Sequence, residues 1–396
     1  MKNPPFTEPT AAPPFNSNIP HRQVLTMTSL QEPDTEAAQA GSTMCAVVKT
    51  RPESGIEFVT TYPEPQVSAG KVKIQIAAAS VCGTDRALYE YSPMAQAFNL
   101  KIPVVLGHEC AGTIIEVGSG VESLNVGDKV ALESHVACWD CYPCRTGDAH
   151  NCLNMQLLGL HLDGGFAERL VVPATACFKL PEDFPLEQGA LLEPAGVAMH
   201  AIQRSKIDLA GADVVISGGG PVGLFIAAIA GAEGAANVVV VEPNAYRRGL
   251  IEALGATALA PEDDVVGTCR KLSGEKIGFD VAFEASGVPA ALPPLLEALR
   301  REATVVAVGI PGQPIELDVA AYLIKKGLTF TGSFGRALWG TWEQIAELVA
   351  SGKLDLSKFV THRLPLSALD EAIELLSQDS CKVLLIPALP NRPSNQ

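Results

Sequence analysis

Four cysteines lie close together between residues 138 and 152, in a short stretch that also contains proline and glycine. They are Cys138, Cys141, Cys144 and Cys152. This spacing is too crowded for an ordinary disulfide framework in a chain of this length. Four thiolates instead complete the tetrahedral shell of a zinc ion and leave no position for a substrate. The sequence therefore predicts a structural zinc site in a lobe at about residues 135–153.

A second set of metal-ligating residue types is spread along the chain. Cys82 begins a Cys-Gly-Thr-Asp run, His108 and Glu109 are adjacent, and Glu193 precedes a proline. A catalytic zinc ion takes three protein ligands and keeps one position open to water or substrate. Cys82, His108 and either Glu109 or Glu193 meet this requirement. The spacing alone leaves a second interpretation open, because an isolated cysteine and histidine are often packing residues.

A glycine-rich turn follows an apolar run at residues 213–217 and leads into a second apolar run. This order is typical of a strand, a Gly-x-Gly-x-x-Gly turn and a helix that together bind a dinucleotide. Gly218 permits the tight turn, Gly220 lets the backbone approach the pyrophosphate, and Gly223 lets the helix pack on the strand. The predicted cofactor contacts of this turn are Gly218, Gly220, Pro221, Val222 and Gly223.

Glu242 ends the next apolar run, about twenty positions after the turn. A carboxylate at that point accepts hydrogen bonds from the adenosine ribose and repels the additional phosphate of NADP, so we predict NAD as the cofactor. Arg247 and Arg248 follow within a turn and offer positive charge to such a phosphate, which keeps NADP as the less favoured alternative. A role of Glu242 as a helix cap is compatible with either cofactor.

Two later segments are expected to line the nicotinamide, because each follows an apolar run that resembles a parallel strand. The segments are residues 284–287 and 308–310. The predicted cofactor contacts beyond the glycine-rich turn are Glu242, Arg247, Ser286, Val308, Gly309 and Ile310.

The elements that must position these residues fall into two classes, so the predicted fold class is α/β. From Met44 onward, short apolar runs separated by turn residues predict a barrel-like β domain. Its predicted strands include residues 44–49, 71–77 and 111–117. Beyond Glu193, buried strands alternate with helical stretches, which predicts a doubly wound parallel sheet with strands at 213–222, 237–242, 279–283, 304–309 and 328–331. The final segment predicts helices at 342–351 and 366–377 and a strand at 381–386 that returns to the first domain.

Composition excludes several classes of function. The 396 residues suffice for two or three domains, and 47% hydrophobic with 18% charged residues is typical of a globular chain. The net charge of −15 argues against nucleic acid or an anionic membrane as a partner. No apolar run approaches the roughly 20 residues that span a bilayer. Residues 1–43 lack hydrophobic periodicity and a targeting pattern, which predicts a disordered extension on a cytoplasmic protein.

Taken together, these motifs resemble the zinc-containing medium-chain dehydrogenase/reductase superfamily, and the resemblance covers nearly everything after Met44. Its closest likeness within the superfamily is to the L-threonine 3-dehydrogenases, followed by polyol dehydrogenases of the sorbitol type and glucose dehydrogenases. The motifs that carry it are Cys82-Gly-Thr-Asp, Gly107-His-Glu, Gly127-Asp-Lys-Val, the four-cysteine lobe, Glu193-Pro, the glycine-rich turn, Glu133-Ser-His, Gly164-Gly-Phe-Ala-Glu, Gly335-Arg and Thr341-Trp.

The resemblance implies a GroES-like β-barrel catalytic domain from residues 44–194 and 335–396, and a Rossmann NAD-binding domain from residues 195–334. It also implies two zinc ions per chain, one catalytic and one structural, and a homo-oligomer, either a tetramer or a dimer. Cys82, His108 and Glu109 correspond to catalytic zinc ligands, and Glu193 corresponds to a mobile or water-bridged carboxylate. Thr84 corresponds to the hydroxyl that begins the proton relay.

The predicted activity is zinc-dependent hydride transfer between NAD and a small polar secondary alcohol or its ketone. The threonine enzymes carry a histidine five residues after the cysteine, where this chain has Ala87. A segment at residues 89–101, rich in Tyr, Phe and Met, also favours a less polar pocket. A polyol or sugar dehydrogenase acting on sorbitol, butanediol or glucose is an alternative, because these enzymes share many of the same positions. A non-catalytic relative that binds zinc and nucleotide is an alternative of another class.

Overall fold

A computed structural model describes residues 42–390 of the chain. The predicted disordered extension at residues 1–43 lies outside the described residues apart from its last two positions. The first strand, β1 (Thr43–Lys49), begins there, because Met44, Ala46 and Val48 turn a continuous apolar face toward the interior. No helix within residues 42–390 is long and apolar enough to cross a bilayer.

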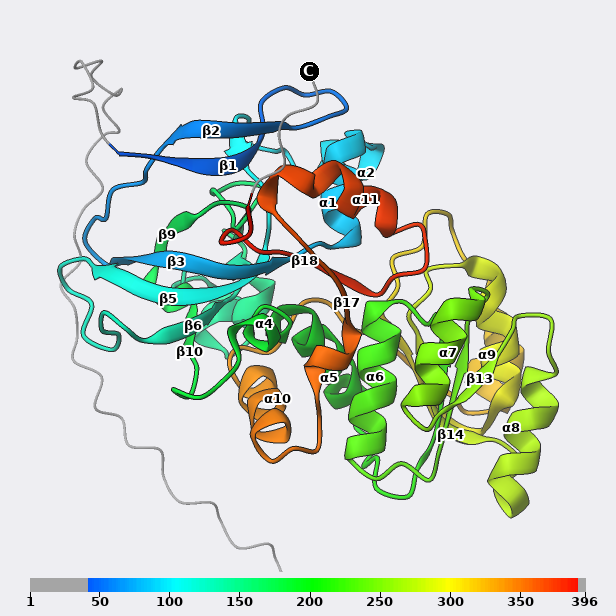
Figure 1. Cartoon of the computed structure of the whole chain (residues 1–396). Coiled ribbons are helices and arrows are strands. Elements are labelled where there is room, and N and C mark those ends of the chain that lie inside the picture. The colour runs from blue at the N-terminus through cyan, green and yellow to red at the C-terminus, as the bar shows by residue number, and fades with distance from the viewer. Residues whose placement is uncertain (1–41, 391–396) are drawn as a thin grey trace, which may run out of the picture. The chain divides into compact units, whose positions relative to one another are not determined.

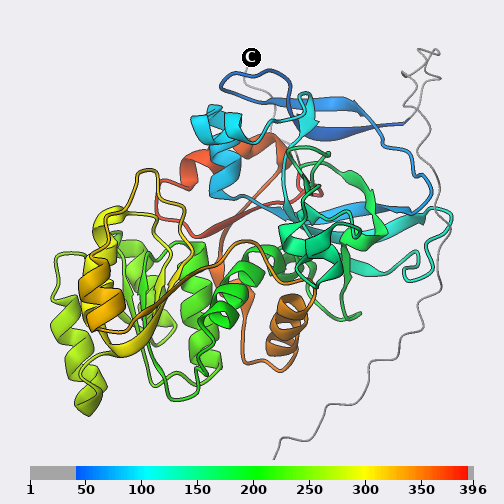
Figure 2. The same ribbon diagram turned by 180° about the vertical axis from the view of Figure 1, so that it is seen from behind.

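The first domain consists mainly of antiparallel β-strands (Figures 1 and 2). A small sheet has the order β2-β1-β4, with β2 at Glu57–Pro63 and β4 at Val104–Val105. The larger sheet has the order β10-β6-β5-β3-β18-β17, and β9 also pairs with β3. Its strands are β3 (Lys71–Ser80), β5 (Glu109–Val117), β6 (Lys129–Leu132), β9 (Arg169–Pro173), β10 (Cys177–Lys179), β17 (Val360–Leu364) and β18 (Lys382–Leu385).

Two short strands and seven helices complete this part of the chain. Two strands at the lobe, β7 (His135–Val136) and β8 (Gln156–Leu157), pair with each other. The helices are α1 (Gly83–Glu90), α2 (Pro93–Ala97), α3 (Tyr142–Arg145), α4 (Leu186–Gly189), α5 (Leu192–Ser205), α10 (Gly340–Ala350) and α11 (Leu369–Leu375). The predicted helix at 366–377 is thus shorter than expected, because its first three residues form a 3₁₀ turn.

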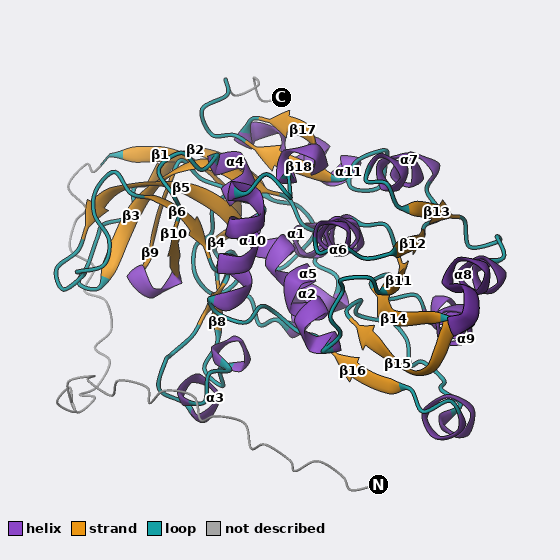
Figure 3. Cartoon of the chain, turned by 90° about the horizontal axis from the view of Figure 1, so that it is seen from below, coloured by secondary structure: helices purple, strands orange, loops and turns teal. Residues whose placement is uncertain are grey.

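The second domain is a six-stranded parallel sheet of order β13-β12-β11-β14-β15-β16, which Figure 3 shows along its edge. Its strands are β11 (Asp213–Ser217), β12 (Asn237–Val241), β13 (Thr257–Leu259), β14 (Phe279–Glu284), β15 (Leu299–Ala307) and β16 (Thr329–Gly332). The connecting helices are α6 (Pro221–Ala232), α7 (Ala245–Ala253), α8 (Val265–Ser273) and α9 (Leu292–Ala298). This strand order, with helices on both faces, is the doubly wound arrangement predicted from the sequence.

Side chains from alternate positions of the central strands serve two separate cores. Val214 and Ile216 of β11 pack with α5 and α6, whereas Val215 points to the opposite core with Leu295 and Leu296 of α9. Both faces are apolar because helices cover both, which is why the sequence shows continuous apolar runs rather than alternation. The predicted strand at 213–222 is too long, since Gly218 turns the chain at a φ of +93° and α6 begins at Pro221.

The C-terminal segment runs back to the first domain. β18 pairs antiparallel with β3, and β17 lies beside β18. Trp342 and Ile345 of α10 are fully buried in the core that α5 shares with the parallel sheet. Residues far apart in the sequence therefore converge where the two domains meet.

Candidate active site and zinc-binding sites

A cluster of three metal-ligating side chains, two buried and one half-buried, lies where β3 and β5 run side by side. Cys82 follows β3 and precedes α1, while Glu109 begins β5 and His108 directly precedes it. The antiparallel register places Ser80 opposite Glu109, which brings the two segments together. One potential ligand atom from each of Cys82, His108 and Glu109 lies within 4.8 Å of the others. A sulfur, an imidazole nitrogen and a carboxylate oxygen at this spacing fit a three-ligand zinc site.

Asp85 holds two of these residues in place. It is fully buried, and its Oδ2 accepts a hydrogen bond from the backbone N–H of Cys82 at 2.9 Å. Its Oδ1 lies 3.4 Å from Nδ1 of His108. A carboxylate facing one nitrogen of a histidine favours a proton on that nitrogen and leaves the other nitrogen available as a ligand.

Glu109 is shared between this cluster and a buried lysine. Lys382 Nζ lies 2.5 Å from Glu109 Oε2 and also donates to the carbonyl oxygen of Val81 at 3.2 Å. The lysine lowers the pKa of Glu109 although burial raises it, so this carboxylate is ionised. Because a carboxylate has two oxygen atoms, the ion pair leaves one of them for a metal ion.

Glu193 belongs to a different buried network. Its Oε1 accepts a hydrogen bond from Ser134 Oγ at 2.7 Å and lies 2.9 Å from Arg336 Nη1. Arg336 also donates to Glu133, at 2.9 Å for the pair Nε and Oε2. Of the two carboxylates left open by the spacing, the structure brings Glu109 into the group with Cys82 and His108, and it ties Glu193 to Arg336.

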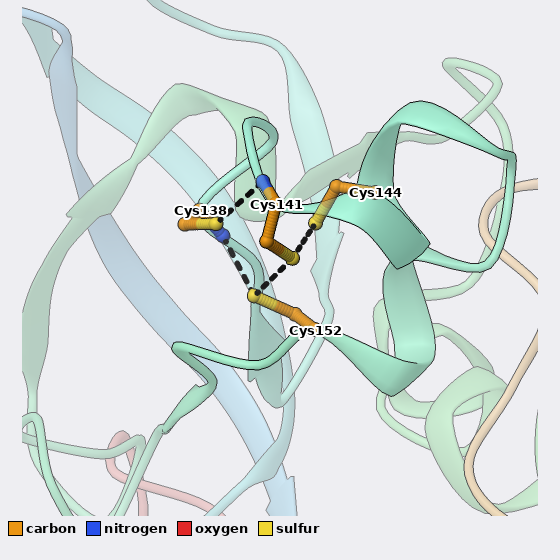
Figure 4. Close-up of side chains that lie close together, drawn as sticks. All are labelled: Cys138, Cys141, Cys144 and Cys152. Carbon is orange, nitrogen blue, oxygen red and sulfur yellow. Dashed lines mark hydrogen bonds between the residues drawn. The ribbon is translucent and has the colours of Figure 1, made fainter.

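The four clustered cysteines surround a common point (Figure 4). One ligand atom from each of Cys138, Cys141, Cys144 and Cys152 lies within 4.8 Å of the others. The sulfur of Cys141 is 3.4 Å from that of Cys144 and 3.8 Å from that of Cys152. Tetrahedral Zn–S bonds of about 2.3 Å separate neighbouring sulfur atoms by close to this distance. The cluster therefore fits a structural zinc ion.

Backbone N–H groups of the lobe point at these sulfur atoms. Hydrogen bonds from the N–H groups of Asp140 and Cys141 lower the pKa of Cys138 to about 6. The N–H of Cys138 in turn donates to Cys152 Sγ at 3.2 Å. Hydrogen bonds from N–H groups stabilise a thiolate at Cys138, whereas burial and the neighbouring thiols raise the pKa of Cys144 to about 12. A bound cation would offset the second effect.

Replacing Cys144 with serine is expected to remove one zinc equivalent and unfold the lobe locally. A structural site contributes its binding free energy to folding, so loss of a ligand destabilises the surrounding loop. We expect a loss of roughly 1–2 kcal/mol, which lowers the melting temperature by about 5 °C. Metal analysis and thermal unfolding measure this. The matched control is Cys177→Ser, which changes a half-buried thiol outside both clusters; an equal loss of zinc in the control would contradict the assignment.

A cavity of about 410 Å³ opens at the carboxyl ends of β11, β12 and β14. Gly218, Gly220, Glu242, Arg247 and Ser286 line it, as do Val241 and Leu295. A Cβ atom on Gly223 would meet the carbonyl oxygen of Gly218 at 1.9 Å, so only glycine permits the close packing of turn and helix there. Pro221 and Val222 form the first turn of α6 beside this cavity.

Two arginines near Glu242 already have backbone partners. Glu242 accepts hydrogen bonds from the N–H groups of Gly219 at 2.7 Å and Asn244 at 2.8 Å. Arg248 donates to the carbonyl oxygen of Glu242 itself. Arg247 donates to the carbonyl oxygens of Leu376 and Ser380, in the segment that returns to the first domain. These contacts direct both guanidinium groups toward the backbone.

Val308, Gly309 and Ile310 line a different cavity, of about 640 Å³, which His150 and His200 also border. The predicted cofactor contacts are therefore divided between two cavities. Burial lowers the pKa of His200, and it also lowers the pKa of His150. Both imidazoles are consequently neutral near pH 7, which suits hydrogen bonding with a polar ligand.

Sequence reasoning missed the charged residues that hold the candidate ligands. Asp85 lies in the Cys82-Gly-Thr-Asp motif, and Glu133 and Arg336 lie in motifs of the family resemblance, but no pattern assigns a role to any of them. One feature of Lys382 could have indicated its role, because it is the single charged residue of an otherwise apolar strand. Such a charge is stable only when it is paired, so it indicates a buried carboxylate elsewhere in the chain.

Comparisons with known proteins follow the same division into two domains. The chain matches the family model of the alcohol dehydrogenase GroES-like domain over residues 68–182 and that of the zinc-binding dehydrogenase over residues 221–351. An L-threonine 3-dehydrogenase of Pyrococcus furiosus is 40% identical over 336 residues, which cover 84% of this chain and 95% of that protein.

Solved structures show the same fold. The 2R,3R-butanediol dehydrogenase of Bacillus subtilis superimposes with a TM-score of 0.79 and 31% identity, covering 87% of this chain and all (100%) of that one. A zinc-binding dehydrogenase of Sinorhizobium meliloti, bound to NADP, has a TM-score of 0.77 and 31% identity over 87% of this chain and 100% of its own. The fold class and the family predicted from the sequence are confirmed. The chain belongs to the zinc-containing medium-chain dehydrogenase/reductase superfamily and is a zinc-dependent, NAD(P)-linked enzyme of the alcohol dehydrogenase type.

Proposed function

We propose that this enzyme interconverts a small polar secondary alcohol and its ketone with NAD as the hydride carrier, and that L-threonine is the first substrate to test. The observation that carries this proposal is the group of Cys82, His108 and Glu109, whose potential ligand atoms lie within 4.8 Å of one another. The relatives named as L-threonine 3-dehydrogenases support the choice of substrate.

The chain's own residues prepare the site for this reaction. A zinc ion held here would supply Lewis-acid polarisation of the alcohol oxygen, and a nicotinamide cofactor would supply the hydride acceptor. Cys82, His108 and Glu109 would hold the zinc ion, while Asp85 orients His108. Thr84, half-buried in the first turn of α1 beside Cys82, is the hydroxyl that we propose to carry the proton outward. Lys382 pairs with Glu109 and lowers its pKa, and Arg336 pairs with Glu193 and holds it in place.

A polyol substrate is the second candidate, because one observation argues against threonine and a second favours a diol. Ala87 is a small apolar side chain, buried on α1 at the position where the threonine enzymes carry a histidine. A 2R,3R-butanediol dehydrogenase also stands among the structural neighbours. Steady-state rates with threonine, butanediol, sorbitol and glucose, followed by NADH absorbance, separate these candidates. The highest kcat/KM identifies the substrate class, and no hydride transfer to any of them by the zinc-loaded enzyme would favour a non-catalytic role.

Preference for NAD follows from Glu242 in this proposal. Replacing Glu242 with glutamine is expected to raise the ratio of kcat/KM for NADP over that for NAD by roughly tenfold, because repulsion of the additional phosphate disappears. The backbone partners of Arg247 and Arg248 support the same preference. The matched control is Glu252→Gln, which removes an equal charge from the exposed side of α7. An unchanged ratio in E242Q would contradict the role of Glu242.

We further propose a homo-oligomer in the reducing cytoplasm. The ten cysteines of the sequence include the four clustered thiols, which must stay reduced to bind zinc.

Exposed apolar side chains gather near the edge strand β16, including Ile310 at 73% exposure and Phe334 at 61%. Burial of such side chains by a second copy would lower the free energy of the assembly. Light scattering during size-exclusion chromatography tests for a dimer or tetramer, and a monomer at micromolar concentration would refute the oligomer.

A further inference from the structure

A basic cavity of about 620 Å³ lies at the amino ends of β14 and β15. Six cationic side chains line it, whereas Glu297 is its one acidic lining residue. The six are Arg270, Lys276, Arg300, Arg301, Lys325 and Lys326. They come from α8, the loop before β14, the start of β15 and the helical turn Ala320–Lys325. Segments far apart in the sequence thus bring positive charge to one place.

Only part of this charge is neutralised by the protein. Lys276 pairs with Asp213 and Asp280, at 2.9 and 2.8 Å, and Arg300 pairs with Asp280 at 2.7 Å. Within residues 42–390 the other four cations have no carboxylate within the 4.0 Å of an ion pair. Glu297, the acidic lining residue, accepts a hydrogen bond from Tyr322 at 2.8 Å.

This concentration of charge is unusual for the chain as a whole, whose net charge is −15. Like charges in a concave surface repel one another, and the low dielectric of the walls strengthens that repulsion. At Lys326 three effects combine: burial lowers its pKa, the carboxylate of Glu297 raises it, and nearby Arg270 lowers it. A bound anion would offset this repulsion.

The cavity is separate from the cofactor cavity. Glu284 ends β14 on the side of the cofactor cavity, and Phe279 begins β14 on the side of the basic cavity. The two are therefore a strand length apart, roughly 20 Å at about 3.3 Å per residue. A ligand in the basic cavity does not touch the glycine-rich turn or the zinc ligands.

We propose that this cavity is a second ligand site, which binds a small anion carrying two or more phosphate groups. Arg270 and Arg301 supply planar guanidinium groups that bind phosphate oxygens in pairs, and Lys325 and Lys326 supply further positive charge. Ile277, which is 68% exposed, and Tyr322 also line the cavity. Their apolar surface can contact an organic part of such a molecule. Neither the alcohol substrate nor the nicotinamide cofactor has a role at this site.

Calorimetric titration with inorganic tripolyphosphate tests the proposal. The zinc-loaded enzyme is first saturated with NADH, so that the phosphates cannot occupy the glycine-rich turn. We expect binding to the native chain, and binding roughly 100-fold weaker to the double variant R301Q/K325Q, which lacks two charge-assisted hydrogen bonds. The matched control K353Q/K358Q removes the same charge from two exposed lysines of the C-terminal segment and should bind as the native chain does.

Unchanged melting temperature and turnover would show that the double variant is folded, and Arg270→Gln serves as a second variant if it is not. Three results would overturn the proposal. They are the absence of tripolyphosphate binding at millimolar concentration, an equal loss of affinity in K353Q/K358Q, and tighter binding of an acidic peptide such as polyglutamate. The last result would identify the cavity as a protein docking site.

Discussion

Replacing Cys82 with alanine is expected to lower kcat by at least about 1000-fold while leaving NAD affinity within about twofold of its original value. The sulfur atom of Cys82 is one of three potential ligand atoms within 4.8 Å, and no other thiol belongs to that group. Loss of a ligand leaves too few protein donors for a firmly held zinc ion. Cys82 does not line the cofactor cavity, so its replacement should leave cofactor binding unchanged. Steady-state kinetics, NADH fluorescence titration and metal analysis measure the three quantities.

Cys177→Ala is the appropriate control for this experiment. Cys177 is a half-buried thiol of β10, burial raises its pKa to about 12, and it belongs to neither group of potential metal ligands. The control should keep both zinc equivalents and nearly full turnover. Retained turnover in C82A would refute the proposed zinc chemistry, and a parallel loss in C177A would show that the effect is general destabilisation.

Features that depend on short stretches of sequence could be predicted. The spacing of Cys138, Cys141 and Cys144 places these sulfur atoms in one loop whatever the rest of the fold does. The strand that ends in a glycine-rich turn at Gly218 is equally local, because a tight turn and close helix packing both require glycine there. Continuous apolar runs indicated the parallel sheet, since strands covered on both faces have no polar side.

Features that depend on long-range pairing could not be predicted. Lys382 and Glu109 are 273 positions apart, and Arg336 and Glu133 are 203 apart. No local pattern links such residues, because they meet only through strand register and domain packing. For the same reason, spacing alone could not distinguish Glu109 from Glu193 as the third zinc ligand. Only the register of β3 with β5 places Glu109, and not Glu193, next to Cys82.

Replacing Arg336 with methionine is expected to lower the free energy of unfolding at pH 8 by about 3–5 kcal/mol. Arg336 is 2% exposed and pairs with both Glu133 and Glu193, which are buried themselves. Its removal leaves two carboxylates without a counter-charge in a region that excludes water. Trp342 Nε1, which donates to Glu133 at 3.2 Å, remains but carries no charge. Denaturant unfolding measures the change, and R336K should lose less because it keeps the positive charge.

The pH dependence of this loss separates an unpaired charge from a packing defect. Burial raises the pKa of Glu133, but the guanidinium of Arg336 outweighs burial, so its pKa is lowered in the native chain. A carboxylate with a lowered pKa stabilises the fold above its unfolded pKa, and this contribution is lost as the pH falls. Without Arg336 burial raises the pKa, so the folded state binds the extra proton and stability increases as the pH falls. R336M should therefore be less destabilised near pH 5.5 than near pH 8, and E133Q should rescue part of the loss at pH 8. An equal loss at both pH values would identify Arg336 as a packing residue.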